Sequence, residues 1–213
     1  MTNILFENAL LRKSQNTPPI WFMRQAGRYH SHYQKLKEKY SFEQLCKTPD
    51  LAAEVASGPV KEFDYDVAIL FSDILFILEG LGLKLEFNPG PKFDFYINSD
   101  NFEKFKDIDR AIDHMQFQSE AIKITREKLS NNKSLIGFVG GPWTLVRYAF
   151  GKDHFTNDHK NLYFEFLSTT LVPLLKKNIK MQLGAGAEIV MIFDSWLYDL
   201  ENEVFKENYI TIL

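Results

Sequence analysis

Short runs of consecutive apolar residues alternate along this chain with longer segments in which apolar residues recur every three or four positions. The four short runs occupy residues 19–23, 67–71, 134–139 and 187–193. Each lacks the polar alternation of a half-exposed strand and ends abruptly in charged, polar or glycine residues. Such runs are typical of strands that are buried on both faces. The pattern therefore predicts four buried strands.

A helix is predicted to begin after Thr48. Thr48 is a favourable N-cap residue, Pro49 suits the first helical turn, and Asp50 places a negative charge at the positive end of the helix. Apolar residues then recur at helical spacing as far as Phe63. Pro59 lies inside this segment, and we expect it to kink the helix, because proline has no N–H to donate to the preceding turn.

Two more helices and one hairpin are predicted further along the chain. Apolar residues recur at helical spacing over residues 109–130 and again over 158–183. The second of these segments contains Pro173, and Gly184 is expected to form its C-terminal cap. Two short apolar segments around a Pro-Gly-Pro turn predict a small hairpin over residues 83–96.

Alternating strands and helices predict an α/β fold with a parallel sheet and helical crossovers. Two architectures fit this order, a doubly wound sheet and a (β/α)8 TIM barrel. In both, ligands bind at the carboxyl ends of the strands. A closed barrel has eight strands in about 250 residues. The four predicted strands therefore form either a small open sheet or the first half of a barrel.

Length and composition are those of one soluble domain over residues 1–213. The chain is 45% hydrophobic with a net charge of -3, which gives no general attraction to nucleic acid or anionic membranes. No apolar stretch is long enough for a membrane span, and the N-terminus lacks the pattern of a signal peptide. The expected location is the cytoplasm. The single cysteine, Cys46, excludes an internal disulfide and a multi-cysteine metal site.

Aromatic residues make up 15% of the chain. The simpler interpretation is that phenylalanine takes the place of leucine in the core. The functional interpretation is a cavity for a flat, largely apolar ligand. Composition is compatible with both interpretations.

Two arginines follow the first predicted strand. Arg24 and Arg28 flank Gln25, Ala26 and Gly27. Guanidinium groups match carboxylates and phosphates, and small residues let the backbone N–H groups approach a ligand closely. The position at a strand end favours an anion-binding site over two ordinary surface arginines.

One carboxylate follows the second predicted strand in an apolar setting. Asp73 lies in the segment FSDIL, residues 71–75. A carboxylate buried there needs hydrogen-bond donors or a positive charge. It is a candidate to accept N–H groups from a ligand, and capping of the next helix is the alternative.

Polar residues also follow the third and fourth predicted strands. Gly140 and Gly141 form a glycine turn that opens a helix carrying Tyr148, without the spacing of a P-loop or dinucleotide fingerprint. Ser195 and a neighbouring aspartate follow the fourth strand, and no GxSxG elbow surrounds this serine. We interpret the glycine turn as the element that presents Tyr148.

The five histidines do not predict a metal site. His30 and His32 have a His-x-His spacing, but they lie about seven residues beyond a strand end, where barrel metal ligands do not normally lie. We expect exposed side chains for both. His114, His154 and His159 occur in helical or loop contexts without matching carboxylates.

The strand-end segments together resemble those of the uroporphyrinogen decarboxylase family. The matching segments are WFMRQAGRY at 21–29, FSDIL at 71–75, LIGF at 135–138, GPWTL at 141–145 with Tyr148, and FDS at 193–195. The resemblance implies a (β/α)8 barrel, usually a homodimer, of which this chain carries the N-terminal half. It implies a carboxy-lyase that converts uroporphyrinogen III to coproporphyrinogen III, in haem biosynthesis, without metal or organic cofactor.

The same resemblance assigns roles to individual residues. Asp73 matches the aspartate that accepts the pyrrole N–H groups and stabilises positive charge on a protonated ring. Arg24 matches a proposed acid. Arg24 and Arg28 both match arginines that contact the acidic rim of the macrocycle. Further contacts to substrate are implied for Gln25, Ala26, Gly27, Tyr148 and Ser195.

The chain departs from the family pattern in two places. His30-Ser31-His32 follows Tyr29 where the family usually has Pro-Glu-Tyr, and no counterpart of the family's late substrate-contacting histidine is present. Two alternatives therefore stay open. One is an inactive half barrel that binds tetrapyrrole or pairs with a complementary half. The other is a related cobalamin-dependent methyltransferase, which the arginine segment disfavours.

Overall fold

The computed structural model describes residues 3–88, 90–151 and 159–212. The chain folds into two compact units. Unit 1 comprises Met1–Asp73, Phe117–Phe138 and Met181–Met191, and unit 2 comprises Ile74–Gln116, Val139–Lys180 and Ile192–Leu213.

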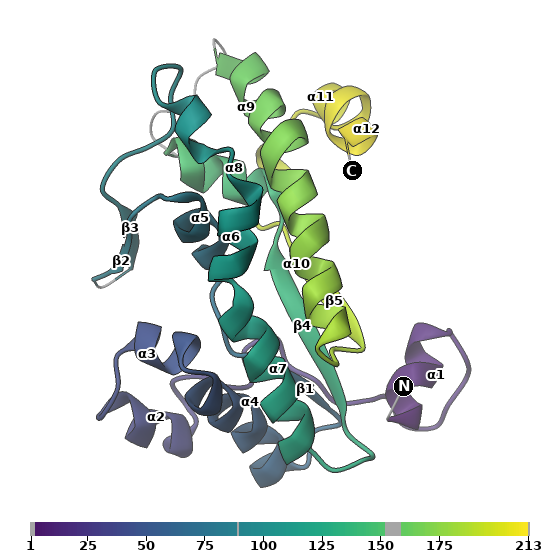
Figure 1. Ribbon diagram of the computed structural model, residues 1–213. Helices are drawn as coiled ribbons and strands as arrows, with labels where there is room; N and C mark the ends of the chain where they lie inside the picture. Colours follow the sequence, from purple (N-terminus) through teal and green to yellow (C-terminus); the bar gives the residue numbers. More distant parts are fainter. Residues whose placement is uncertain (1–2, 89, 152–158, 213) are drawn as a thin grey trace. The chain divides into compact units, whose positions relative to one another are not determined.

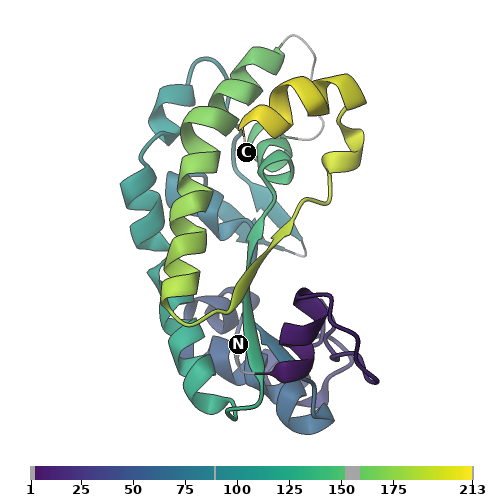
Figure 2. The same ribbon diagram turned by 90° about the vertical axis from the view of Figure 1, so that its right-hand side faces the viewer.

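Three of the four predicted strands are present and form one sheet. They are β1 (Val67–Ile69), β4 (Ser134–Gly140) and β5 (Ile189–Phe193), in the order β1-β4-β5. β1 and β4 are parallel, with Val67 opposite Ser134. Every residue of these two strands is buried, as their continuous apolar runs predict. The prediction of a buried strand is wrong for β5, which is only partly buried, with Ile192 56% exposed. Figure 2 shows β4 and β5 as long arrows that cross the middle of the view.

The prediction of a strand over residues 19–23 is wrong. Ile20 forms one backbone pair with Asp66, whose N–H donates to the Ile20 carbonyl at 3.1 Å, while the Asp66 carboxylate accepts the Ile20 N–H at 2.7 Å. Phe22 and Met23 are about half exposed. The segment is therefore held by a side chain rather than by a strand ladder, which the apolar composition could not reveal.

From residue 3 onward, four helices precede β1 in unit 1. They are α1 (Ile4–Leu10), α2 (Ser31–Lys37), α3 (Phe42–Lys47) and α4 (Pro49–Phe63). α4 confirms the predicted helix start, with Thr48 at the N-cap and Pro49 in the first turn. The helix continues through Pro59 and ends where Asp64 adopts a left-handed conformation with φ 55°.

The segment predicted as one helix over 109–130 forms two. α6 (Ile108–His114) ends at Met115, and α7 (Gln116–Lys128) begins directly after it. Met115 has ψ 2°, outside the helical range, and its N–H donates to Ile112 over a shortened turn. The apolar spacing continues through this break, so the periodicity alone predicted a single helix.

The long segment over 158–183 is helical from residue 160 and contains a wider turn. α9 (Lys160–Phe166) leads into a π-helical turn, Leu167–Leu171, and then into α10 (Val172–Gly184). Figure 1 shows the whole as one green rod. The π turn ends two residues before Pro173, which has no N–H for the regular helical bond.

Gly186, not Gly184, ends this rod. The Gly186 N–H donates to the Leu183 carbonyl and the Ala187 N–H to the Gln182 carbonyl, both at 3.1 Å. This pair of bonds is a Schellman cap, and Gly186 has the left-handed φ of 115° that such a cap requires. The helix therefore extends through Gly184 to a second glycine.

Unit 2 contains the predicted hairpin. β2 (Leu85–Phe87) and β3 (Pro91–Phe93) pair antiparallel, with Leu85 opposite Phe93 (Figure 1). Besides α6, α9 and most of α10, this unit contains α5 (Phe76–Leu81), a 3-10 turn at Phe102–Phe105, α8 (Pro142–Phe150), a 3-10 turn at Leu197–Asp199, α11 (Asn202–Val204), a π turn at Phe205–Tyr209 and α12 (Ile210–Ile212). Its core is aromatic: Phe150 packs edge-to-face on Tyr163 and Phe166, and Phe102 on Phe166.

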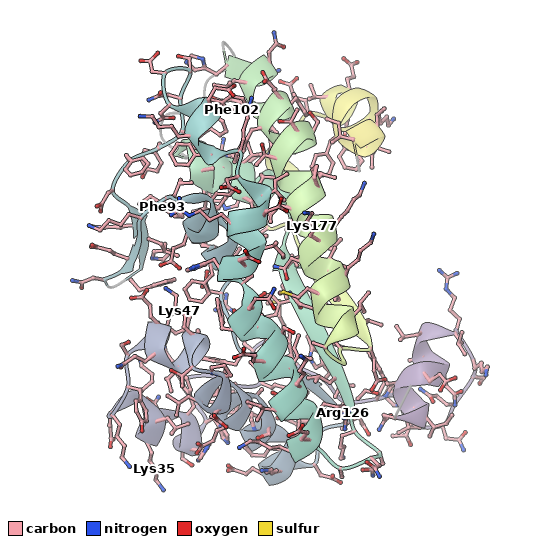
Figure 3. All side chains as sticks on the ribbon, in the orientation of Figure 1. Lys35, Lys47, Phe93, Phe102, Arg126 and Lys177 are labelled. Carbon is pink, nitrogen blue, oxygen red and sulfur yellow. The ribbon has the colours of Figure 1, made fainter. Side chains whose placement is uncertain are left out.

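A hydrogen-bond network joins the amino ends of the strands in unit 1. Arg126 of α7, labelled in Figure 3, donates to the carbonyls of Ser130 and Lys133 at 2.9 and 2.6 Å. Ser134, at the start of β4, donates to Glu188 at 2.9 Å. These contacts lie at the end of the sheet away from the predicted site, and we interpret them as structural.

No helix in the part of the chain that the structure describes is long and apolar enough to cross a membrane.

Candidate active site

The arginine loop, residues 24–28, consists of tight turns between residues 19–23 and α2. The Gln25 N–H donates to the Phe22 carbonyl at 3.1 Å, and the His30 N–H donates to the Gly27 carbonyl at 3.0 Å. A Cβ at Gly27 would lie 3.1 Å from the Arg24 carbonyl oxygen. The small residue between the two arginines thus permits this close turn.

Gln25 fastens the arginine loop to β1. Its side chain is 1% exposed and donates to the Val67 carbonyl at 2.9 Å, while its amide oxygen accepts the Phe22 N–H at 3.3 Å. The Tyr29 hydroxyl donates to the Gln25 carbonyl. The buried amide is therefore committed to the protein, and we interpret Gln25 as a residue that positions the loop.

Arg24 and Arg28 both have exposed side chains. Among the described residues, neither guanidinium forms an ion pair with a carboxylate. Arg24 borders an open hollow of about 560 Å³ whose other lining residues are Phe22, Met23, Tyr29 and Tyr65. A cation beside aromatic and aliphatic side chains suits an apolar ligand that carries carboxylates.

The end of β1 and the arginine loop pack against the same hydrophobic cluster. Ala26 of the loop and Phe71, two residues before Asp73, both contact it. The cluster is formed by Tyr33, Leu36, Leu45 and Val55. The Phe71 and Tyr33 rings meet edge-to-face at 5.5 Å between centroids. Unit 1 therefore packs Ala26 of the arginine loop and Phe71, two residues before Asp73, on one cluster, although they are more than forty residues apart in the sequence.

The charges of Asp73 and Arg28 each affect a buried residue of unit 1, Cys46 and Tyr33 respectively. Burial raises the pKa of the Cys46 thiol well above its ordinary value, and the nearby Asp73 carboxylate raises it further. Burial also raises the pKa of Tyr33, whereas the Arg28 guanidinium lowers it. A buried thiol that holds its proton is unreactive, so the interpretation of Cys46 as a structural cysteine stands.

His30 is buried, so the expectation of an exposed side chain is wrong for this residue. It is 1% exposed, and its Nε2 lies 2.8 Å from the Glu62 carboxylate on α4. His32 is partly exposed and pairs with Glu54 of α4 at 3.2 Å. A Cβ at Gly58, between the two glutamates, would approach both rings to within 3.1 Å. The two histidines thus dock the start of α2 on α4.

The remaining histidines lie in unit 2 or outside the described residues. His114 pairs with Glu79 at 3.0 Å, which corrects the view that it lacks a matching carboxylate. His159 packs against Tyr163 at 6.4 Å, and His154 lies outside the described residues. Within the described ranges, His, Cys, Asp and Glu side chains form no group of three that could hold a metal ion.

Tyr148 and Ser195, the other two predicted site residues, lie in unit 2. Tyr148 is half-buried in α8, which begins directly after Gly141 as the glycine turn predicts. Ser195 is exposed in the turn that follows β5.

Asp194 is a residue whose role the sequence did not reveal. Its carboxylate accepts the backbone N–H groups of Trp143 at 3.2 Å and Thr144 at 2.7 Å, at the N-terminus of α8. It also accepts the hydroxyl groups of Thr144 at 2.6 Å and of Tyr209. The negative charge therefore lies against the positive end of a helix dipole.

The glycine turn supplies the signal that could have identified this role. Gly141 is the N-cap of α8 and has no side chain to satisfy the first N–H groups of the helix. A cap must then come from elsewhere, and a carboxylate at the next strand end is a candidate. The Gly141 N–H also donates to the Phe193 carbonyl at 2.8 Å, which places Asp194 beside the helix start.

The contact of Tyr209 with Asp194 predicts an alkaline loss of stability. Burial first, and the Asp194 carboxylate second, raise the pKa of Tyr209 above its ordinary value of 10.0. Above this value the unfolded chain releases the proton while the folded chain keeps it. The free energy of unfolding should then fall with rising pH, by up to about 1.4 kcal/mol per pH unit. Urea unfolding of wild type and Tyr209→Phe across this range should show a steeper fall in wild type, because other buried groups such as Tyr33 contribute equally to both proteins; equal slopes would contradict the prediction.

Comparison with known proteins decides the family. The family model described as "Uroporphyrinogen decarboxylase (URO-D)" matches residues 1–213. The chain belongs to the uroporphyrinogen decarboxylase family. Uroporphyrinogen decarboxylases of Helicobacter acinonychis (strain Sheeba), Orientia tsutsugamushi (strain Ikeda) and Campylobacter lari are 42%, 42% and 40% identical, over 95%, 91% and 96% of this chain. The chain spans 62%, 59% and 63% of the lengths of these relatives.

A solved structure supports the fold of this family member. A methyltransferase from Methanosarcina mazei superposes with a TM-score of 0.81, over 99% of this chain and 64% of that chain. The sequence identity is 17%, so this likeness bears on the fold alone. An α/β fold with parallel strands, as the sequence predicts, is confirmed.

Proposed function

We propose that the protein is a carboxy-lyase that removes the four acetate carboxyl groups of uroporphyrinogen III and forms coproporphyrinogen III. Membership of the uroporphyrinogen decarboxylase family supports the reaction class. The observation that carries the proposal is that Ala26 and Phe71 pack on one cluster. This packing supports a common site within unit 1 for the arginine loop and Asp73, and these are the groups that an acidic macrocycle with central N–H groups requires.

The reaction needs a place for the electrons of the broken C–C bond. Protonation of a pyrrole carbon gives a cationic iminium ring. When carbon dioxide leaves, the bonding electrons neutralise this ring as an exocyclic double bond. A proton added to the exocyclic carbon gives the methyl group, and the ring carbon returns its extra proton. Asp73 stabilises the positive charge that the ring carries during these steps, and it accepts the pyrrole N–H groups.

The arginines act on the carboxylates of the substrate. A guanidinium group releases its proton only with difficulty, so orientation of the acetate and propionate groups by Arg24 and Arg28 is the primary role we propose for them. Proton donation by Arg24 is a secondary proposal. Their exposure and the lack of an acidic partner among the described residues leave both guanidinium groups available.

The other residues of the family pattern have supporting roles in the proposal. Ala26 and Gly27 let the loop backbone approach the substrate. Gln25 acts through its hold on β1. Tyr148 and Ser195 provide further polar contacts to the same substrate. The proposal also includes a cytoplasmic homodimer built on a (β/α)8 barrel, with one domain over residues 1–213 as part of it, and a reaction that uses no metal or organic cofactor.

Binding without turnover is a second candidate function. The chain spans 62% of the length of its Helicobacter acinonychis relative, and the family's late substrate-contacting histidine has no counterpart in these 213 residues. A half barrel with Asp73 and the arginine loop intact would bind porphyrinogen without completing the reaction, or pair with a complementary half.

Anaerobic incubation with uroporphyrinogen III tests both candidates. Oxidation of the products, followed by chromatography, separates porphyrins according to the number of carboxylates they retain. Coproporphyrin formation supports the decarboxylase. Binding of uroporphyrinogen, measured by fluorescence quenching of the tryptophans, with no product supports the second candidate. Absence of both would overturn the two proposals together.

A further inference from the structure

We propose that Gln118 is a positioning residue for Asp73, that it acts by holding Ser72, and that Gln182 in turn holds Gln118. The inference rests on the proposed function, because Asp73 is the group to be positioned. All four residues lie in unit 1. The three residues other than Asp73 form a chain of hydrogen bonds, here called the glutamine relay.

The relay begins at Ser72, the neighbour of Asp73. The Gln118 amide nitrogen donates to the Ser72 hydroxyl oxygen at 2.8 Å. The Leu70 N–H still donates to the Ile136 carbonyl at 3.0 Å, but residues 70–73 have no regular secondary structure. At Ser72 a side chain from α7 therefore takes over the task of fixing the backbone that carries Asp73.

Gln118 is itself held from α10. Its amide oxygen accepts from the Gln182 amide nitrogen at 3.2 Å, and the same nitrogen donates to the Phe138 carbonyl of β4 at 2.9 Å. This pattern defines the orientation of both amides, because a flip of either would place two donors or two acceptors face to face. The relay thus ties Ser72 to two helices and the central strand.

Both glutamines of the relay are shielded from water. Gln118 is 2% exposed and Gln182 is 0% exposed. Buried amides are costly unless they are hydrogen-bonded. An apolar residue at either position would fill the same space without this cost. Polar side chains here are therefore better explained by the geometry they impose on the strand end than by stability.

Gly137 of β4 makes room for the relay. A Cβ at this position would lie 2.1 Å from the Gln182 amide oxygen, closer than atoms can approach. The Gln182 side chain thus occupies the space that a side chain at residue 137 would need. Gly137 and Gln182 of α10 therefore depend on each other, because a larger residue at position 137 would leave no room for the Gln182 side chain.

Gln118→Leu tests the inference, with Ser72→Ala as a second variant that removes only the anchor at the strand end. Thr125→Val is the matched control. Thr125 is buried on the same helix, two turns away, and its hydroxyl donates to the Ala121 carbonyl at 2.6 Å. The control therefore loses one buried hydrogen bond of α7 that does not lead to Asp73.

The first measurement is amide hydrogen exchange of a peptide covering residues 70–75. We expect exchange in Gln118→Leu and Ser72→Ala to be about tenfold faster than in wild type, and unchanged in Thr125→Val. The second is turnover of uroporphyrinogen III by the protein that carries this chain. We expect kcat to fall about tenfold or more with little change in KM, because a small displacement of a catalytic group is costly.

Two results would overturn the inference: unchanged exchange at 70–75 in both relay variants, or an equal effect in Thr125→Val. Failure of the proposed function is a separate result, namely absence of turnover in wild type. The exchange measurement does not depend on turnover, so it still decides whether the relay holds the strand end.

Discussion

Replacement of Asp73 by asparagine is expected to lower kcat for uroporphyrinogen III by about 10²–10³-fold while the protein stays folded. The change keeps the size of the side chain but removes the negative charge that would stabilise the cationic ring. Loss of one such electrostatic group in a site that excludes water typically has an effect of this size. Steady-state product formation and thermal unfolding, measured on the same preparations, check both parts.

His32→Ala is the control for this experiment. His32 follows the arginine loop by a few residues, but its ring turns to Glu54 of α4 rather than to the strand end. We expect only a small change in kcat for this variant. Equal losses in the two variants would show that the effect reflects the general integrity of unit 1 and would contradict the assignment of Asp73.

The structure also predicts an effect of the Asp73 charge on the ionisation of the Cys46 thiol. The carboxylate adds to burial in raising the pKa of Cys46. Neutral asparagine removes this contribution, so the Cys46 thiol should ionise somewhat more readily in the variant. Burial remains the larger cause, and slow reaction of the thiol in both proteins is the expected background.

A hydrophobic pattern predicts a strand correctly where the segment pairs with other strands of a sheet. β1 and β4 follow from their continuous apolar runs because both strands are buried along their whole length, whereas β5 has an equally apolar run and is only partly buried. Residues 19–23 have the same composition, yet the Asp66 carboxylate and the Gln25 amide hold them. A hydrophobic pattern does not show whether a segment pairs with a neighbouring strand or is held by hydrogen bonds to side chains. The prediction of a strand over residues 19–23 is wrong for this reason.

The residues of the candidate site likewise differ in how well the sequence alone predicts their roles. Arg24, Arg28 and Asp73 stand out in sequence because charge at the end of an apolar run is unusual. The burial of Gln25 and the burial of His30 depend on residues about thirty to forty positions away, which single-sequence reasoning does not locate. Asp194 is recognisable in the sequence as a strand-end carboxylate, but its partners begin at Trp143, more than fifty positions earlier.

Gly141→Ala is expected to destabilise unit 2 by about 3 kcal/mol or more. A Cβ on residue 141 would lie 2.1 Å from the Asp194 Cβ and 2.5 Å from its Cα. Because backbone atoms are among those in the way, rotation of a side chain cannot relieve the clash, and the strand end must move away from α8. This movement would also separate the Asp194 carboxylate from the N–H groups of Trp143 and Thr144.

Gly184→Ala provides the opposite expectation for the same chemical change. Gly184 lies in the last turn of α10, and a Cβ there meets no atom within 4 Å. Alanine favours the helix over glycine by about 0.5–1 kcal/mol, so this variant should be slightly more stable than wild type. Urea unfolding followed by circular dichroism compares the two. If Gly141→Ala were as stable as Gly184→Ala, the close approach of the β5 end to α8 would be wrong, and with it the role of Asp194 as the cap of that helix.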